Sequence, residues 1–132
     1  MVRALITDPV DEYIVNELSK HGVIINYKPS INKDELLRIV KDYELLVVRG
    51  RTKVTRDVID TASKLRIIAR AGVGLDNIDV EYARSKGIEV INAPEGSTQS
   101  VAELVIGLMI TAARLVVLQD RLVKGGEWPK GK

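Results

Sequence analysis

The chain has 132 residues, enough for one domain with a hydrophobic core. Hydrophobic residues make up 45% and charged residues 29%, proportions that are ordinary for a globular protein. A net charge of +2 argues against a nucleic-acid surface, and the absence of cysteine excludes disulfides and thiolate metal sites. The apolar N-terminal stretch is too brief for a signal peptide, so we expect a cytoplasmic protein. From the charge, we expect no nucleic-acid partner.

Short apolar runs alternate with helical patterns along the first 97 residues. The helices are expected after capping signals, namely Asp8-Pro9, the capping box Asn32-Lys33-Asp34-Glu35, and Thr55, and another follows from Val80. Because the strands are apolar on both faces, they predict an α/β fold, a five-stranded parallel doubly wound sheet of flavodoxin-like order. The expected strands are Val2–Thr7, Val23–Tyr27, Glu44–Val48, Leu65–Ala69 and Ile88–Ile91.

The last predicted element is one long helix from Ser100 to about Lys124, opened by the capping box Ser100-Val101-Ala102-Glu103. It is apolar nearly all round from Val101 to Leu118, so it is expected to be buried on several sides, and its polar interruptions argue against a membrane span. We therefore predict a sheet domain over residues 1–97, a linker helix within residues 98–132, and self-association as a homodimer through residues 100–124.

Three predicted strand ends carry unusual residues, and in a parallel sheet such ends meet at one crevice where ligands bind. In Gly72-Val73-Gly74, the glycines let backbone N–H groups approach an anion, which we favour over a turn needed for geometry alone. As a dinucleotide fingerprint the stretch is incomplete, since Asn77 stands where a third glycine is required. Arg49 and Arg51 flank Gly50; they suit a phosphate group, and two solvated loop arginines are an equally good interpretation.

Five motifs in register resemble the N-terminal part of the D-isomer-specific 2-hydroxyacid dehydrogenases. This resemblance implies a substrate-binding lid, followed by a helix that crosses into an NAD-binding Rossmann domain and helps to form a dimer. The family's nucleotide fingerprint, catalytic histidine with its glutamate, and catalytic arginine would follow later. We therefore expect a fragment with no catalytic residue in this stretch, with NAD bound mainly by a missing domain and no hydride transfer by the fragment alone. The motifs are Arg49–Thr55, Arg70–Asp79, Gly87-Ile88, Asn92-Ala93-Pro94 and Ser100–Leu104.

The resemblance also assigns roles to single residues. The N–H groups of Val73 and Gly74 are expected to hold the carboxylate of a small 2-hydroxy acid. Within the family, the motifs are most similar to those of members that oxidise 3-phosphoglycerate, and glyoxylate and hydroxypyruvate reductases share much of the pattern. Ser97 stands where many relatives carry a substrate-contacting asparagine. The expected substrate set is Arg49, Gly50, Arg51, Val73, Gly74 and Ser97, and the expected cofactor set is Val73, Thr98 and Val101.

Other chemistries are disfavoured by position. His21, the only histidine, is expected at the end of the first helix, away from the crevice. Asp8, Asp76 and Asp79 are expected as caps and turn residues, so no metal is implied. A receiver-like signalling domain shares the fold but needs an aspartate where Arg49 stands. A self-associating interaction module remains an alternative from another class.

Overall fold

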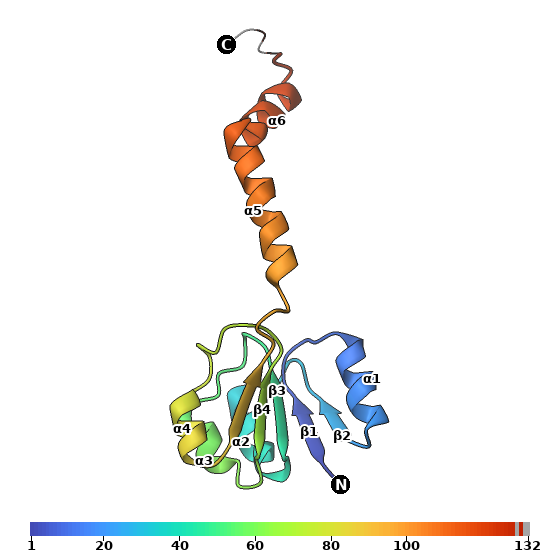
Figure 1. Ribbon diagram of the computed structural model, residues 1–132, viewed down its shortest axis with the longest axis vertical. Helices are drawn as coiled ribbons and strands as arrows, with labels where there is room; N and C mark the ends of the chain where they lie inside the picture. The colour runs from blue at the N-terminus through green and yellow to red at the C-terminus, as the bar shows by residue number, and fades with distance from the viewer. Residues whose placement is uncertain (129, 131–132) are drawn as a thin grey trace. The chain divides into compact units, whose positions relative to one another are not determined.

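The computed structural model describes residues 1–128 and 130 of the chain. These divide into two compact units, Met1–Gly96 and Ser97–Lys132. The first unit contains the sheet and its helices, and the second contains two further helices (Figure 1).

The first unit is built on a five-stranded parallel sheet in the order β2-β1-β3-β4-β5 (Figure 1). Leu46 in the central strand pairs with Leu5 on one side and Ile68 on the other, so apolar residues align across the sheet. This order confirms the predicted flavodoxin-like sheet. The strands are β1 (Arg3–Ile6), β2 (Ile24–Tyr27), β3 (Leu45–Val48), β4 (Ile67–Arg70) and β5 (Glu89–Asn92).

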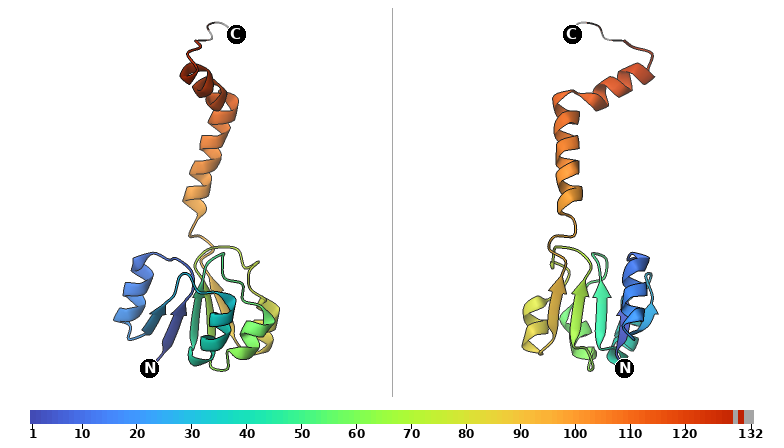
Figure 2. Two further views of the ribbon diagram at one scale, coloured as in Figure 1. Left: turned by 180° about the vertical axis from the view of Figure 1, so that it is seen from behind. Right: turned by 45° about the vertical axis from the view of Figure 1, so that its right-hand side comes forward.

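Helices lie on both faces of this sheet (Figure 2). On one face is α1 (Glu12–Lys20); on the other are α2 (Lys33–Ile39), the short 3₁₀ helix η1 (Val40–Asp42), α3 (Arg56–Thr61) and α4 (Val80–Ser85). The main core lies on the second face, where alternate strand residues pack against these helices. Burying each large aliphatic side chain contributes about 1.5–3 kcal/mol. The core includes Leu5, Leu46, Val48, Ile68, Leu36, Val58 and Ala83.

The helix caps differ from the predicted ones in two places. The first helix is capped by Asp11, whose carboxylate accepts from the N–H of Tyr13 at 2.8 Å, so the prediction that Asp8-Pro9 opens it was wrong. Asp8 is engaged elsewhere, as described below. Asn32 does cap α2 by accepting from the N–H of Glu35 at 2.9 Å. The return bond of the predicted capping box is replaced, because the Glu35 carboxylate pairs with Lys28.

The second unit corrects the prediction of one continuous helix. It contains α5 (Thr98–Ala113) and α6 (Val116–Lys124), whose axes are bent by 61° at a break where Leu115 adopts a left-handed conformation with φ of 51°. Neither glycine nor proline marks this position, so the sequence pattern does not reveal the break. The predicted capping box was also wrong: Ser97 is the N-cap residue, and Glu103 accepts from Gln99 at 2.9 Å. In the described part of the chain, no single helix has the length and hydropathy of a membrane span; α5 and α6 reach them only when taken together.

Candidate functional site

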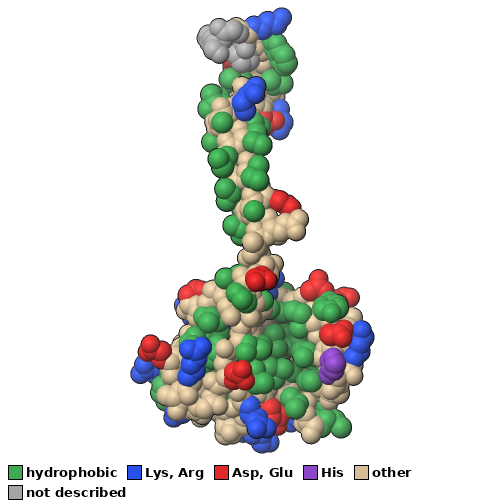
Figure 3. Space-filling view, in the orientation of Figure 1, with side chains coloured by type: hydrophobic (Ala, Val, Ile, Leu, Met, Phe, Trp, Pro, Cys, Tyr) green, Lys and Arg blue, Asp and Glu red, His purple; other side chains and the backbone are tan. Residues whose placement is uncertain are grey.

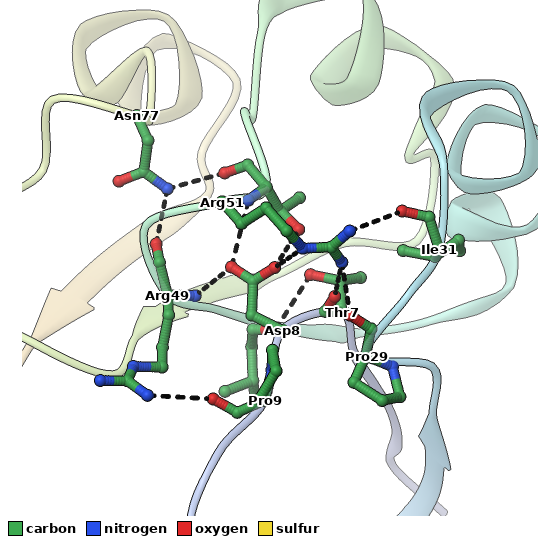
Figure 4. Close-up of polar contacts among 10 residues, drawn as sticks. Thr7, Asp8, Pro9, Pro29, Ile31, Arg49, Arg51 and Asn77 are labelled. Carbon is green, nitrogen blue, oxygen red and sulfur yellow. Dashed lines mark hydrogen bonds and ion pairs between the residues drawn. The ribbon is translucent and has the colours of Figure 1, made fainter.

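The carboxyl ends of β1, β3 and β4 meet at one edge of the sheet and bring three loops together (Figure 4). We call residues 49–52 the arginine loop and residues 71–74 the glycine turn. Parallel pairing sets this arrangement, since Val48 at the end of β3 lies beside Arg70 at the end of β4. Both loops belong to the first unit.

Asp8, two residues after the end of β1, is the buried centre of this edge, with a side chain only 1% exposed. One carboxylate oxygen, Oδ2, accepts from the backbone N–H groups of Arg49 at 2.7 Å and Thr52 at 3.1 Å. The other, Oδ1, accepts from Thr52 Oγ1 at 2.7 Å and Arg51 Nε at 3.2 Å (Figure 4). Burial alone would raise the pKa of Asp8, but these hydrogen bonds and the Arg51 charge outweigh burial and hold the pKa below its ordinary value. The carboxylate is thus ionised and fully used as an acceptor.

The guanidinium N–H groups of Arg51 donate hydrogen bonds to other groups of the protein. Besides Asp8, its guanidinium donates to the carbonyl oxygens of Thr7 at 2.7 Å and Pro29 at 2.6 Å, and at 3.5 Å to that of Ile31 (Figure 4). These carbonyls belong to the segments that follow β1 and β2. Arg51 therefore ties three strand-end segments together, and its predicted contact with substrate remains a prediction.

Arg49 is placed differently, although it is only two residues away. Among the described residues, its guanidinium makes one hydrogen bond, to the carbonyl of Pro9 at 3.3 Å, and the side chain extends away from Asp8 (Figure 4). Most of its five donors therefore lack an acceptor among the described residues. Of the two arginines, Arg49 has the greater capacity to bind an anion.

Asn77 links the arginine loop to the segment that follows the glycine turn. Its amide nitrogen, Nδ2, donates to the carbonyl oxygens of Arg49 and Thr52, each at 2.7 Å (Figure 4). Its Oδ1 is buried and has no hydrogen-bond partner among the described residues. Sequence reasoning noted Asn77 only as a missing third glycine and overlooked these two bonds.

The glycine turn leaves backbone donors available. Gly72 has a φ of +151°, a conformation that side chains rarely adopt, and its carbonyl accepts from the N–H of Ala93 at 2.9 Å. The Val73 carbonyl accepts from Asn92 Nδ2 at 2.7 Å, which anchors the turn to the end of β5. Within residues 1–128 and 130, no acceptor takes the N–H of Val73 or Gly74. Both residues are exposed, so these N–H groups are available to a ligand, and their predicted contact with the substrate carboxylate remains a prediction.

Arg70 is a candidate that sequence reasoning missed. An added Cβ at Gly72 would come within 1.6 Å of Arg70 Nη1, so the guanidinium lies directly over this glycine, and its Nη2 lies 3.8 Å from an added Cβ at Gly50. Its Nε is buried without a hydrogen-bond partner in the described part of the chain. A positive charge with unused donors thus stands between the arginine loop and the glycine turn. Its position as the last strand residue before Gly-x-Gly was the available signal.

Three of the remaining sequence candidates lie at the start of α5. Ser97 caps α5 without a side-chain hydrogen bond, Thr98 is its first residue, and the N–H of Val101 donates to Ser97 O at 2.9 Å. These three belong to the second unit, and their predicted roles remain predictions. As predicted, His21 caps the end of α1, and Asp79 caps α4 through the N–H of Tyr82 at 3.1 Å.

Comparisons with known proteins identify the family of this chain. The family described as D-isomer specific 2-hydroxyacid dehydrogenase, catalytic domain, matches residues 4–119. The chain is 51% identical over 130 residues to D-3-phosphoglycerate dehydrogenase of Methanocaldococcus jannaschii, covering 98% of the chain and 25% of that protein. It is 44% identical over 128 residues to hydroxypyruvate reductase of Thermotoga maritima, covering 97% and 42%.

A solved structure shows the same architecture. NAD⁺-bound 3-phosphoglycerate dehydrogenase of Entamoeba histolytica superposes with a TM-score of 0.74 at 30% identity, covering 99% of this chain and 42% of that one. The chain spans about a quarter of the length of the first curated relatives it matches. A receiver-like domain is not supported, since Arg49 follows β3 and the family match covers most of the chain. The chain belongs to the D-isomer-specific 2-hydroxyacid dehydrogenase family.

Proposed function

We propose that this chain is the substrate-binding part of a longer NAD-dependent oxidoreductase that converts 3-phospho-D-glycerate to 3-phosphohydroxypyruvate in serine biosynthesis. The observation that carries the proposal is the set of unused donors at one sheet edge: the N–H groups of Val73 and Gly74 beside the guanidinium of Arg70. The 51% identity to a D-3-phosphoglycerate dehydrogenase supports the same substrate.

The substrate's charges match these donors. Phosphoglycerate has a carboxylate at one end, a phosphate at the other, and the reacting hydroxyl between them. Paired backbone N–H groups suit a carboxylate, and guanidinium groups suit a phosphate, which they bind with two parallel hydrogen bonds. Arg49 and Arg70 supply this positive charge, while Arg51 is held by Asp8 and three carbonyls.

NAD would be bound mainly by a part of the longer protein outside this chain. When bound, it would accept the hydride. Of the residues present, the family resemblance assigns Val73, Thr98 and Val101 to the cofactor and Ser97 to the substrate. The exposed side chain and free N–H of Val73 fit that assignment. The proposed part played by this chain is to bind and orient the hydroxy acid.

A second candidate is a reductase of glyoxylate or hydroxypyruvate, which the 44% identity to the Thermotoga maritima hydroxypyruvate reductase favours. These substrates have no phosphate and need only one anion site. The two functions therefore differ in what they require of Arg49.

The test is a binding titration of the 132-residue chain with 3-phosphoglycerate and with D-glycerate. The readout is the ¹⁵N chemical shifts of the backbone amides. We expect phosphoglycerate to shift the amide signals of Val73 and Gly74 and to bind at least about tenfold more tightly than glycerate, the gain of one charge-assisted contact of roughly 1.5–3 kcal/mol. Arg49→Gln should weaken this preference, since Arg70 remains. Arg56→Gln is the matched control, because Arg56 pairs with Asp79. Equal affinity for both ligands would favour the second candidate.

We also propose that the second unit mediates a homodimer. Every described residue of α5 and α6 is at least partly exposed, and hydrophobic side chains run along both helices (Figure 3). Such a surface is rarely left exposed to water. Sedimentation at micromolar concentration should give a dimer, and Leu108→Gln with Met109→Gln should weaken it; a monomeric unmodified chain would contradict the proposal. The exposed residues include Leu104, Ile106, Leu108, Met109 and Ile110.

A further inference from the structure

We propose that Asp8 and Asn77 are positioning residues, which hold the arginine loop in the shape that presents its donors to the substrate anion. The inference rests on the proposed function and adds the side chains that preorganise the site. It also gives Asp8 and Asn77 roles that the sequence patterns do not suggest.

The two side chains act on the same two residues. Asp8 accepts from the N–H groups of Arg49 and Thr52, and Asn77 donates to the carbonyl oxygens of those residues. Both backbone polar groups at each end of the arginine loop are therefore held by side chains. Between these ends, the N–H groups of Gly50 and Arg51 have no acceptor in the described part of the chain.

The chemistry of each position is specific. Asp8 faces four donors, which only an ionised carboxylate can satisfy, because an asparagine would turn an N–H₂ group toward some of them. Asn77 faces two carbonyl oxygens, where an aspartate would add repulsion and a glycine would leave both without this donor.

Asn77 also connects the loop to the glycine turn. It lies three residues after Gly74, and its own backbone is fixed to the strand-like segment after the arginine loop, where the N–H of Val54 donates to Asn77 O at 2.8 Å. Val54 and Ile78 pair there as an isolated parallel bridge. The amide of Asn77 therefore fixes the spacing between the Arg49 side of the site and the free N–H groups of Val73 and Gly74.

Arg51 completes the frame from the other side. Its bonds to Asp8, Thr7 O and Pro29 O anchor the loop to the segments after β1 and β2. It acts as a positioning residue, and the anion falls to Arg49 and Arg70. Holding binding groups in place before the ligand arrives improves affinity by removing the ordering cost at binding.

The experiment compares Asp8→Asn and Asn77→Ala with Asn26→Ala in the 132-residue chain. Asn26 is the matched control, because it is part-buried and its Nδ2 donates a hydrogen bond to Tyr43 Oη at 2.6 Å. It lies on β2, whereas the arginine loop follows β3. Amide hydrogen exchange measures protection at Arg49 and Thr52, and titration gives the Kd for 3-phosphoglycerate of the folded fraction.

We expect both loop variants to lose amide protection at Arg49 and Thr52. They should also bind phosphoglycerate about tenfold more weakly, the lower end of the effect that removing residues that orient metal ligands has on metal binding. Asn26→Ala should change stability alone. Unchanged protection, or an unchanged Kd for the folded variants, would overturn the positioning role. If the unmodified chain fails to bind phosphoglycerate, the proposed function falls instead, while the exchange data still decide whether the two side chains hold the loop.

Discussion

The arginine loop and the glycine turn follow neighbouring strands at the same sheet edge. They differ in which of their backbone polar groups are hydrogen-bonded within the protein. In the arginine loop, Asp8 and Asn77 occupy the N–H and carbonyl groups of Arg49 and Thr52. In the glycine turn, the carbonyls of Gly72 and Val73 are anchored, while the N–H groups of Val73 and Gly74 have no acceptor among the described residues.

The difference separates a supporting loop from a binding loop. The arginine loop uses the polar groups of Arg49 and Thr52 for anchoring, which leaves its side chains and the N–H groups of Gly50 and Arg51 for a ligand. A turn whose N–H groups are unused can bind an anion through its backbone, provided that hydrogen bonds to its carbonyls hold it in place. Four changes test this comparison.

The largest effect is expected from removing the charge of Asp8. Asp8→Asn should lower the free energy of unfolding by about 3 kcal/mol at pH 7, because it leaves the half-exposed Arg51 and buried donors without their acceptor. The folded-state pKa of Asp8 lies below its ordinary value of 3.8. Its contribution is therefore complete above that value and is lost as pH falls through the folded pKa.

Urea unfolding of both proteins between pH 7 and pH 2.5 measures this effect. The difference between them should shrink by at most about 1.4 kcal/mol per pH unit, the limit for one proton. Other carboxyls with lowered pKa values, including Asp57 at about 2, are present in both proteins and should largely cancel. A difference in the free energy of unfolding that stays constant with pH would contradict a stabilising role for the ionised carboxylate of Asp8.

Gly72→Ala tests the binding loop. The φ of +151° is strained for alanine, and the new Cβ would displace the guanidinium of Arg70. We expect a loss of about 1–3 kcal/mol of stability and weaker binding of phosphoglycerate. Gly87→Ala is the control, because its φ is +76° and nothing lies within 4 Å of an added Cβ, so it should show backbone strain without a change in Kd.

Thr52→Val sharpens the comparison within the arginine loop. It removes the hydroxyl donor to Asp8 but keeps the backbone N–H bond, so we expect about 1 kcal/mol of destabilisation by thermal unfolding. Thr61→Val removes a hydroxyl that donates to Asp57 O on α3 and is the control. A larger loss in the control would show that Asp8 gains little from Thr52.

His21→Ala should have the smallest effect. Its side chain is 76% exposed at the end of α1, where the chain turns back toward the start of β2. Binding of phosphoglycerate, followed by titration at pH 6 and pH 8, should match that of the unmodified chain at each pH. A changed affinity for phosphoglycerate would contradict the position of His21 away from the site.

Local patterns predicted much of the fold and part of the site. The five strands, their parallel order, the caps at Asn32 and Asp79, and the glycine turn all follow from neighbouring residues, because apolar periodicity, capping and φ preference are short-range properties. The break at Leu115 was not predictable, since neither glycine nor proline marks it.

Tertiary structure decided which polar residues carry the site. Asp8 and Arg49 are separated by 41 positions, and Asn77 and Arg49 by 28, so no local pattern shows that they meet. By itself the sequence determined that strand ends rich in arginine and glycine would face one crevice. Only the packed sheet decided that Asp8 holds Arg51, that Asn77 spans the arginine loop, and that Arg70 lies over Gly72, because hydrogen bonds between distant segments form only once the strands are in register.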